Sequence, residues 1–342
     1  MKDLILVTGG TGYIGSHTVV ELIKGGYEVV IVDNLANSTL ESLAGIEKIT
    51  GIRPAFERFD LCDTNRVGEF FAKYTQLKAI IHFAAHKAVG ESVENPLKYY
   101  HNNLASLINL LHFMDQYNVE NLVFSSSCTV YGQPKELPVS ESTPTLPAES
   151  PYGNTKQISE EIIRDTMIAL PRLNSIALRY FNPIGAHPSG HIGELPMGVP
   201  NNLVPFITQT AAGIHKSLQV YGSNYDTPDG SAIRDYINVN DLARAHVTAV
   251  SRLLERKNNS NYEFFNLGTG TGTSVLEMIR IFREVTGINI NYKIVERREG
   301  DIEKVWADTR FANQELGWKA TTTLEETLAS AWKWEKNLRG IK

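Results

Sequence analysis

Tyr152 and Lys156 stand four residues apart, and this pair is the part of the chain best suited to moving a proton. Isoleucines at helical spacing follow Tyr152, so we expect a helix on which both side chains share one face. A free phenol has a pKa of about 10 and is a poor base at neutral pH. A neighbouring ammonium stabilises the phenolate and lowers that pKa. Lowering it by about three units takes about 4 kcal/mol, which Lys156 and a cationic cofactor ring could supply together.

A hydroxyl group close to this pair would complete a proton relay. The apolar run at 121–124 is followed by three serines, of which Ser127 is the last. Together with Tyr152 and Lys156 it would move a proton on or off an alcohol. A Tyr-x-x-x-Lys pair also occurs often by chance, so the rest of the chain must decide between a catalytic pair and an incidental one.

Alternating strands and helices are needed to bring these residues together. Apolar runs typical of parallel strands covered on both faces recur through residue 181, and helical patterns separate them. The alternation predicts an α/β fold with a doubly wound parallel sheet of the Rossmann type. A looser pattern follows, which predicts a smaller C-terminal α/β substrate domain. We expect one domain of residues 1–182 and about 236–270, and a second domain of about 183–235 and 271–342.

A glycine-rich turn joins the first predicted strand to the first predicted helix. Gly9, Gly12 and Gly15 stand three residues apart, between the apolar run 4–7 and a helical pattern. Glycines here allow a tight turn and a close approach to a pyrophosphate, which then lies on the helix N-terminus. The spacing differs from the commoner Gly-x-Gly-x-x-Gly, but the strand–turn–helix context supports the same interpretation. The alternative is a tight turn without a ligand.

An acid ends the second predicted strand. Asp33 can accept hydrogen bonds from adenosine ribose hydroxyls, and its charge would repel a 2′-phosphate, so the sequence favours NAD over NADP. Asn34, Asn37 and Ser38 follow and can reach the same ribose or phosphate. The alternative is that Asp33 only forms a turn with Asn34.

Later strands end in further polar residues. Asp60 could take the adenine amino group, although an ordinary loop acid is nearly as good an interpretation. Lys87 follows the strand at 79–85, at the end where ligands bind in open α/β sheets. Asn102 lies near a helix start, from which its amide can reach inward. His82 lies inside its strand and is expected to be a hydrogen-bonded core histidine.

Composition excludes several classes of protein. The 342 residues carry a net charge of −5 without a basic stripe, which argues against nucleic acid as a partner. No apolar run approaches the length of a membrane span, and no signal-peptide pattern opens the chain. Two cysteines, Cys62 and Cys128, have no metal-binding spacing and suit reduced thiols. We therefore expect a cytoplasmic protein without a metal site or a membrane association.

The motifs together resemble the UDP-glucose 4-epimerase family of the extended short-chain dehydrogenase/reductase superfamily. The glycine turn, Asp33, Ser127 and the Tyr152–Lys156 pair carry the superfamily likeness. Stretches that narrow it to the epimerases run along nearly the whole chain, at 83–92, 125–132, 179–188, 233–236, 298–301 and 315–318.

This resemblance implies an NAD-dependent isomerase that interconverts UDP-galactose and UDP-glucose through a transient 4-keto sugar. It implies that Tyr152 is the base that removes the proton of the sugar 4-hydroxyl. Lys156 would lower the pKa of that phenol and bind the nicotinamide ribose, and Ser127 would hydrogen-bond the reacting oxygen. From the residues and the resemblance together, the expected NAD contacts are Gly9, Gly12, Tyr13, Ile14, Gly15, Asp33, Asn34, Asn37, Ser38, Asp60, Leu61, Phe83, Ala84, Ala85, Lys87, Asn102, Tyr152, Lys156 and Phe181.

A UDP-sugar requires cationic clamps for two phosphates and a flat apolar contact for uracil. Arg234 and Arg298 are the candidates for the phosphates, Tyr221 for the uracil and Asp301 for the ribose. Without the resemblance, each arginine would be read as a solvated surface charge. The resemblance places further substrate contacts at Lys87, Ser127, Tyr152, Asn182, Asn202, Leu203, Gln219 and Val305.

One position departs from the pattern of family members confined to plain hexoses. Those members tend to carry tyrosine four residues after the aspartate that matches Asp301, and this chain has Val305. Valine leaves more room than tyrosine, so we expect some tolerance of UDP-N-acetylglucosamine and UDP-N-acetylgalactosamine.

Three other functions compete with the epimerase. A nucleotide-sugar dehydratase needs an acid for elimination, commonly just after the position of Ser127, where Cys128 and Thr129 stand here. A net dehydrogenase or reductase would release reduced cofactor. Non-catalytic dinucleotide sensors often lack the Tyr/Lys pair, which this chain keeps. The resemblance also implies a homodimer formed through the helices at 104–114 and 158–167.

Overall fold

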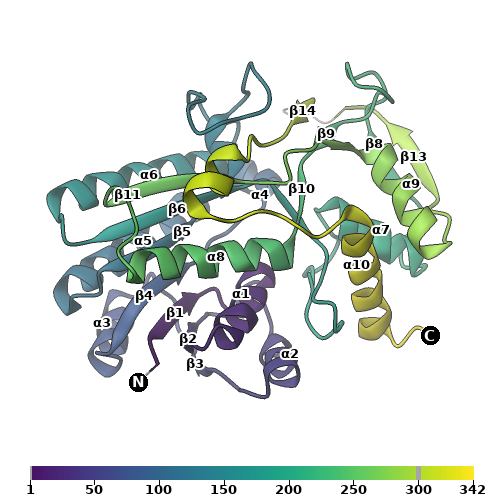
Figure 1. Ribbon diagram of the computed structural model, residues 1–342. Coiled ribbons are helices and arrows are strands. Elements are labelled where there is room, and N and C mark those ends of the chain that lie inside the picture. Colours follow the sequence, from purple (N-terminus) through teal and green to yellow (C-terminus); the bar gives the residue numbers. More distant parts are fainter. Residues whose placement is uncertain (1, 298–301) are drawn as a thin grey trace.

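The computed structural model describes residues 2–297 and 302–342. A seven-stranded parallel sheet forms the centre of its larger lobe (Figure 1). The strand order is β11-β6-β5-β4-β1-β2-β3, and every neighbouring pair is parallel. This confirms the predicted doubly wound α/β fold. The order reverses between β1 and β4, the point at which such sheets bind ligands. The strands are β1 (Leu4–Thr8), β2 (Glu28–Val32), β3 (Ala55–Glu57), β4 (Leu77–His82), β5 (Asn121–Ser125), β6 (Asn174–Tyr180) and β11 (Tyr262–Leu267).

Helices cover both faces of this sheet, as strands apolar on both sides require. In β1, Ile5 and Val7 belong to one core and Leu4 and Leu6 to the other, because successive side chains point to opposite faces. The first core packs against α1 (Tyr13–Lys24), α2 (Glu41–Thr50) and α8 (Val239–Leu254), and the second against α3 (Thr64–Lys73), α5 (Pro96–Tyr117) and α6 (Pro151–Ala169).

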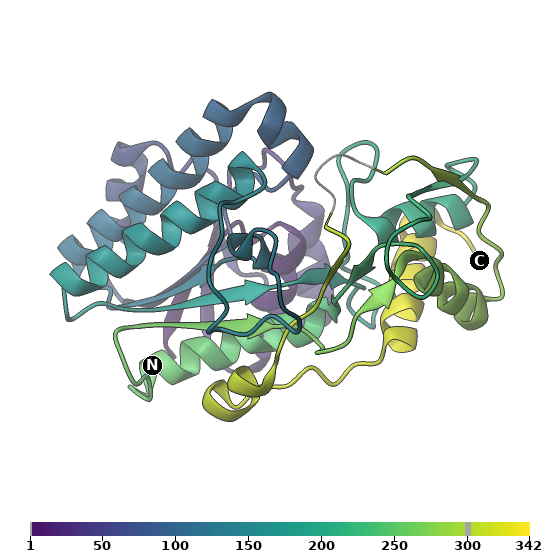
Figure 2. The ribbon, with the colours of Figure 1, turned by 90° about the horizontal axis from the view of Figure 1, so that it is seen from above.

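A smaller lobe lies beside the carboxyl ends of the strands (Figure 2). Its core joins Ile207, Phe282 and Leu328 from three helices. The elements of this lobe and of its junction with the sheet are α7 (Leu203–Ala211), α9 (Val275–Thr286), α10 (Leu324–Arg339), β7 (Asn182–Ile184), β8 (Leu218–Tyr221), β9 (Ile233–Arg234), β10 (Tyr236–Asn238), β12 (Thr273–Ser274), β13 (Tyr292–Val295) and β14 (Lys304–Val305).

The chain crosses between the lobes more than once. The predicted return to the first lobe near residue 236 is seen in α8 and β11, and a later return follows at η2 (Ala312–Leu316). Leu316 and Trp318 pack into the first core, so this short stretch lies with the sheet rather than with the helices around it in sequence. The two-domain division itself stays a prediction.

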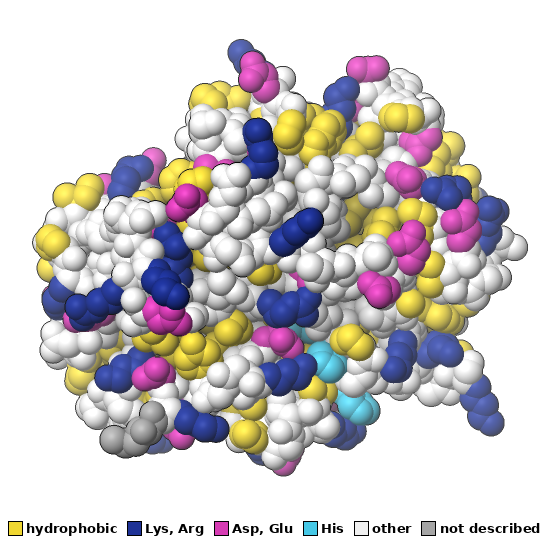
Figure 3. Space-filling view, viewed as in Figure 1, with side chains coloured by type: hydrophobic (Ala, Val, Ile, Leu, Met, Phe, Trp, Pro, Cys, Tyr) yellow, Lys and Arg dark blue, Asp and Glu magenta, His cyan; other side chains and the backbone are white. Residues whose placement is uncertain are grey.

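Three smaller findings concern the helices, the surface and the interior. None of the described helices is long and apolar enough to cross a membrane. Acidic and basic side chains are interspersed over the face seen in Figure 3. His82 is buried, and its Nδ1 lies 2.8 Å from the Thr8 hydroxyl, as expected of a core histidine.

Candidate active site

A large cavity lies between the two lobes, at the carboxyl ends of the strands. Its volume is about 1860 Å³, and both lobes line it. That volume exceeds the roughly 300–1,000 Å³ of a typical small-molecule site, so it has room for two ligands side by side. Every predicted site residue within the described part of the chain lines this cavity, except Val305. Arg298 and Asp301 lie outside the described residues.

The glycine turn closes tightly at the start of α1. Gly9 has φ +68°, and a Cβ there would lie 2.8 Å from the backbone nitrogen of Ala84. A Cβ on Gly15 would lie 2.3 Å from the Gly9 carbonyl oxygen. Gly12 precedes α1, and this residue has no side chain that could accept from the first N–H groups of the helix. The turn therefore leaves a helix N-terminus bare toward the cavity, which suits a pyrophosphate.

Asp33 lies beside this turn at the end of β2. Its carboxylate accepts hydrogen bonds from the backbone N–H of Leu35 at 2.9 Å and of Thr11 at 3.3 Å. The Ser38 hydroxyl donates to it at 3.1 Å. These bonds fix the carboxylate in a position that a ribose diol could reach. The bond from Leu35 is a turn contact, as the alternative interpretation of Asp33 required.

Asp60 reaches the same edge of the sheet. Asn34 donates its Nδ2–H to an Asp60 oxygen at 3.0 Å. Burial raises the pKa of Asp60, but hydrogen bonds from Cys62 and Asn34 outweigh that effect and hold the pKa below its ordinary value. The acid is therefore ionised at neutral pH. Asp33, Asn34 and Asp60 thus form one polar part of the cavity wall.

The Tyr152 helix and the β5 strand bring the three predicted catalytic residues together. Ser150 caps α6, its hydroxyl accepting from the Gly153 N–H at 3.2 Å. The Lys156 ammonium donates to the Ser125 carbonyl oxygen at 2.6 Å and lies 5.9 Å from the centre of the Tyr152 ring. Ser127 lies close enough to Tyr152 to lower the pKa of its phenol. The three predicted catalytic residues therefore lie close together in the structure.

Burial dominates the electrostatics of this group. Burial raises the pKa of Tyr152, a nearby Tyr180 adds to the rise, and Ser127 opposes it. Burial also lowers the pKa of Lys156 to about 8, although Glu160 opposes that change. The prediction that Lys156 and a cationic cofactor ring together lower the phenol pKa stays a prediction. Desolvation of the phenolate outweighs one ammonium that is already bound to a backbone carbonyl.

A buried ion pair supports the serines, and sequence reasoning missed it. Arg179 and Glu160 are both buried, with Arg179 Nε donating to Glu160 Oε1 at 2.9 Å. Ser126 donates to the same oxygen at 2.5 Å. Arg179 also donates to the Tyr131 hydroxyl at 2.9 Å. The pair thereby fixes the end of β5, which Ser127 follows. No local sequence pattern predicts this ion pair.

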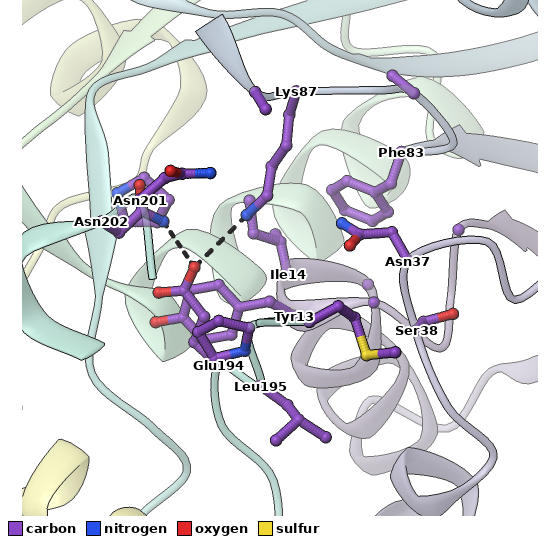
Figure 4. A pocket seen from close by; sticks show the side chains of 18 of the residues that line it. Tyr13, Ile14, Asn37, Ser38, Phe83, Lys87, Glu194, Leu195, Asn201 and Asn202 are labelled. Atoms are coloured by element: carbon purple, nitrogen blue, oxygen red, sulfur yellow. Dashed lines mark hydrogen bonds and ion pairs between the residues drawn. The ribbon is translucent and has the colours of Figure 1, made fainter. Parts of the chain in front are cut away.

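A second residue that sequence reasoning missed lines the same cavity. Glu194 is in ion-pair distance of Lys87, with 3.5 Å between Oε1 and Nζ, and Asn202 donates to the same oxygen at 2.6 Å (Figure 4). Tyr13 lies next to this group, and its hydroxyl donates to the Gly185 carbonyl at 2.6 Å. Burial raises the pKa of Tyr13, and the Glu194 charge raises it further.

Residues of the smaller lobe complete the cavity wall. Arg234 Nη1 donates to the Ile233 carbonyl at 2.9 Å, which holds the guanidinium close to its own strand. Tyr221 donates to Gln219 at 2.7 Å. Val305 is buried and packs with Cys128 and Phe181, two residues that do line the cavity. Val305 therefore lies behind the wall rather than in it.

Comparison with known proteins agrees with this geometry. The family model described as GDP-mannose 4,6 dehydratase matches residues 6–331. UDP-glucose 4-epimerase of Bacillus subtilis (strain 168) is 50% identical over 339 residues, 99% of this chain and 98% of the relative. A crystal structure of UDP-glucose-4-epimerase from Stenotrophomonas maltophila with bound NAD and formylated UDP-arabinopyranose is 44% identical with TM-score 0.95, covering all of both chains. That of the Bifidobacterium longum enzyme in complex with NAD+ and UDP is 45% identical with TM-score 0.94, covering 99% of this chain and all of the other.

Proposed function

The chain belongs to the UDP-glucose 4-epimerase family of the extended short-chain dehydrogenase/reductases, and we propose that it interconverts UDP-galactose and UDP-glucose as an NAD-dependent isomerase. One observation carries the proposal. The glycine turn with Asp33, the Ser127–Tyr152–Lys156 group and Arg234 all line one cavity. A dinucleotide and a nucleotide sugar bound there would meet between the two lobes.

The residues of the first lobe fit NAD. The bare start of α1 suits the pyrophosphate, and the fixed Asp33 carboxylate suits the ribose hydroxyls while repelling a 2′-phosphate. When bound, NAD supplies the hydride acceptor for sugar C4 and a positive charge that favours the Tyr152 phenolate. That charge is the contribution that Lys156 does not make by itself.

The chain's own residues hold the proton and the reacting oxygen. Tyr152 takes the 4-hydroxyl proton, and Ser127 donates a hydrogen bond to the same oxygen. Lys156, fixed by the Ser125 carbonyl, keeps a positive charge near the phenol at pH values below about 8. Burial excludes water from the phenol, so the proton taken from the sugar is kept for return.

Inversion at C4 requires the sugar to turn while its nucleotide stays bound. Arg234 of the smaller lobe would hold the diphosphate and Tyr221 the uracil. We further assign Arg298 to the diphosphate and Asp301 to the ribose. Few directional contacts at the sugar end would let the 4-keto sugar present its other face to Tyr152. Firm binding at the nucleotide end thus retains the uncharged ketone between the two half-reactions.

A direct assay separates this reaction from its rivals. Purified protein is mixed with UDP-galactose without added oxidant or reductant. UDP-glucose should form without net accumulation of NADH. Accumulation of NADH would indicate a net dehydrogenase, and no product at all would indicate a dinucleotide sensor.

The dehydratase in the description of the matching family model is disfavoured by the residues after Ser127. Elimination needs an acid there, and Cys128 and Thr129 follow instead. Burial raises the pKa of the Cys128 thiol to about 12, so it is a poor source of a proton or of a thiolate. Formation of a 4-keto-6-deoxy sugar in the same assay would overturn this assignment.

We further propose that Val305 permits turnover of UDP-N-acetylglucosamine. Val305 packs behind Cys128 and Phe181, so a larger side chain would push into the cavity between them. Val305→Tyr should lower kcat/KM for the N-acetylated sugar about 10- to 200-fold relative to UDP-galactose, the usual range for a change in pocket size.

The opposite variant serves as the control for this size effect. Val305→Gly should raise the relative kcat/KM for the N-acetylated sugar, and a melting curve of each variant checks that it folds. An unchanged ratio in both variants would contradict the proposal. So would a wild-type protein that converts UDP-galactose but not UDP-N-acetylglucosamine.

We also propose a homodimer in the cytoplasm. The helices α5 and α6 pack against one another, and they expose Ile108 (50%) and Ile168 (69%) on their outer surface. Exposed apolar side chains on adjacent helices favour burial against a second copy. Solution scattering should give twice the chain mass, and a monomeric mass would contradict the dimer.

A further inference from the structure

An acid inside this cavity needs an explanation. Glu194 lines the space proposed for two diphosphate ligands, and its side chain is only 12% exposed. Its negative charge repels phosphates and by itself lowers their affinity for the cavity, so the carboxylate must have a second, favourable role. Its contacts indicate what that is.

One oxygen of Glu194 joins the two lobes. Oε1 lies 3.5 Å from the Lys87 ammonium, which follows β4 in the larger lobe. The same oxygen accepts from the Asn202 amide at 2.6 Å, and Asn202 immediately precedes α7 in the smaller lobe. Figure 4 shows the carboxylate between these two side chains. Both partners are among the substrate contacts assigned above.

The backbone of Glu194 is itself held in place. The Trp334 indole of α10 donates to the Glu194 carbonyl at 2.9 Å. Gly193 lies flat against the same ring, since a Cβ there would come within 2.4 Å of Trp334 Cγ. Asn337 and Lys333, also of α10, bind the carbonyls of Gly190 and Pro188. The carboxylate is thus presented from a fixed loop.

Lys87 depends on such a partner. Its side chain is 49% exposed and carries four flexible methylenes, so holding its ammonium in one place costs conformational entropy. We infer that Glu194 is a positioning residue that holds Lys87 and Asn202 at the substrate's end of the cavity, and that it thereby makes substrate affinity depend on both lobes. The inference rests on the proposed function.

Glu194→Gln tests this inference. Glutamine keeps an oxygen that accepts from Asn202, but it removes the charge that holds Lys87. We expect the KM for UDP-galactose to rise about tenfold, kcat to stay within about twofold and the bound NAD to be retained. The dissociation constant for UDP-glucose, measured by calorimetry, should rise by a similar factor. If Glu194 only stabilised the fold, the variant would be less stable and would not show a rise in KM at nearly unchanged kcat.

Glu149→Gln is the matched control. Glu149 is an exposed acid at the rim of the same cavity, so its replacement removes an equal charge from the same space. Its KM should stay the same or fall, because only repulsion of the diphosphate is lost.

Other outcomes would overturn either the inference or the proposed function. An unchanged or lower KM in Glu194→Gln would overturn it by showing that the carboxylate only repels substrate. Loss of NAD as the main effect would also overturn it. A wild-type protein without epimerase activity would instead reject the proposed function, and calorimetry with UDP-glucose would still report on Glu194.

Discussion

Replacing Tyr152 with phenylalanine is expected to lower kcat about a thousandfold and to leave NAD bound. The change deletes one oxygen, the atom assigned to receive the sugar proton, and proton transfer by a positioned side chain contributes about 10²- to 10⁴-fold. The ring stays, so packing in α6 is kept. The glycine turn and Asp33, which are expected to hold NAD, are not altered by the substitution. The initial rate of UDP-glucose formation and the NAD content of the purified variant are the two measurements.

Tyr100→Phe makes the same chemical deletion outside the cavity. The Tyr100 hydroxyl accepts a hydrogen bond from Asn154 of α6 at 2.7 Å, so this variant also loses one contact to the same helix. Its kcat should stay close to that of the wild type. A near-normal rate in Tyr152→Phe would show that another group is the base, and equal losses in both variants would point to α6 packing rather than to proton transfer.

Gly15→Ala is expected to abolish NAD binding. A Cβ at this position would lie 2.3 Å from the Gly9 carbonyl oxygen and 2.8 Å from the Gly10 Cα, and both atoms are backbone. The turn must therefore open, which displaces the start of α1 from the place where a pyrophosphate would lie. We expect a protein purified without NAD, inactive, and destabilised by roughly 1–3 kcal/mol, as for other overpacked sites. Cofactor released on denaturation and the melting temperature are measured.

Gly25→Ala tests the same substitution at the other end of the same helix. Gly25 has ordinary helical angles (φ −72°), and the nearest atom to a new Cβ is 3.3 Å away. This variant should keep its NAD and its activity. If Gly15→Ala also kept them, the cofactor would not lie on this turn.

The sequence predicted the fold and the first-lobe site because both depend on local patterns. Apolar strands between helical stretches are enough to predict a doubly wound sheet, and the carboxyl ends of its strands must then meet. Gly9, Asp33, Ser127 and Tyr152 all lie at those ends, so their convergence followed from the topology.

Residues that depend on long-range contacts could not be predicted in this way. Glu194 stands in an irregular loop, and its place is set by Trp334, 140 residues later in the chain. The Glu160–Arg179 pair joins a helix to a strand in a buried network. The effect of burial on the Tyr152 pKa was missed for a related reason. Spacing along a helix shows which charges are near, but not how far water is excluded from them.

The position of β11 has a consequence for synthesis of the protein. This strand completes the edge of the large sheet beside β6, yet the whole segment 183–261 separates the two along the chain. Trp318 then fills the same core from still farther downstream. A nascent chain that has emerged only as far as β6 therefore exposes an unpaired strand and a half-built interior, a state prone to aggregation. The nucleotide-binding lobe becomes whole only when nearly the entire polypeptide has left the ribosome.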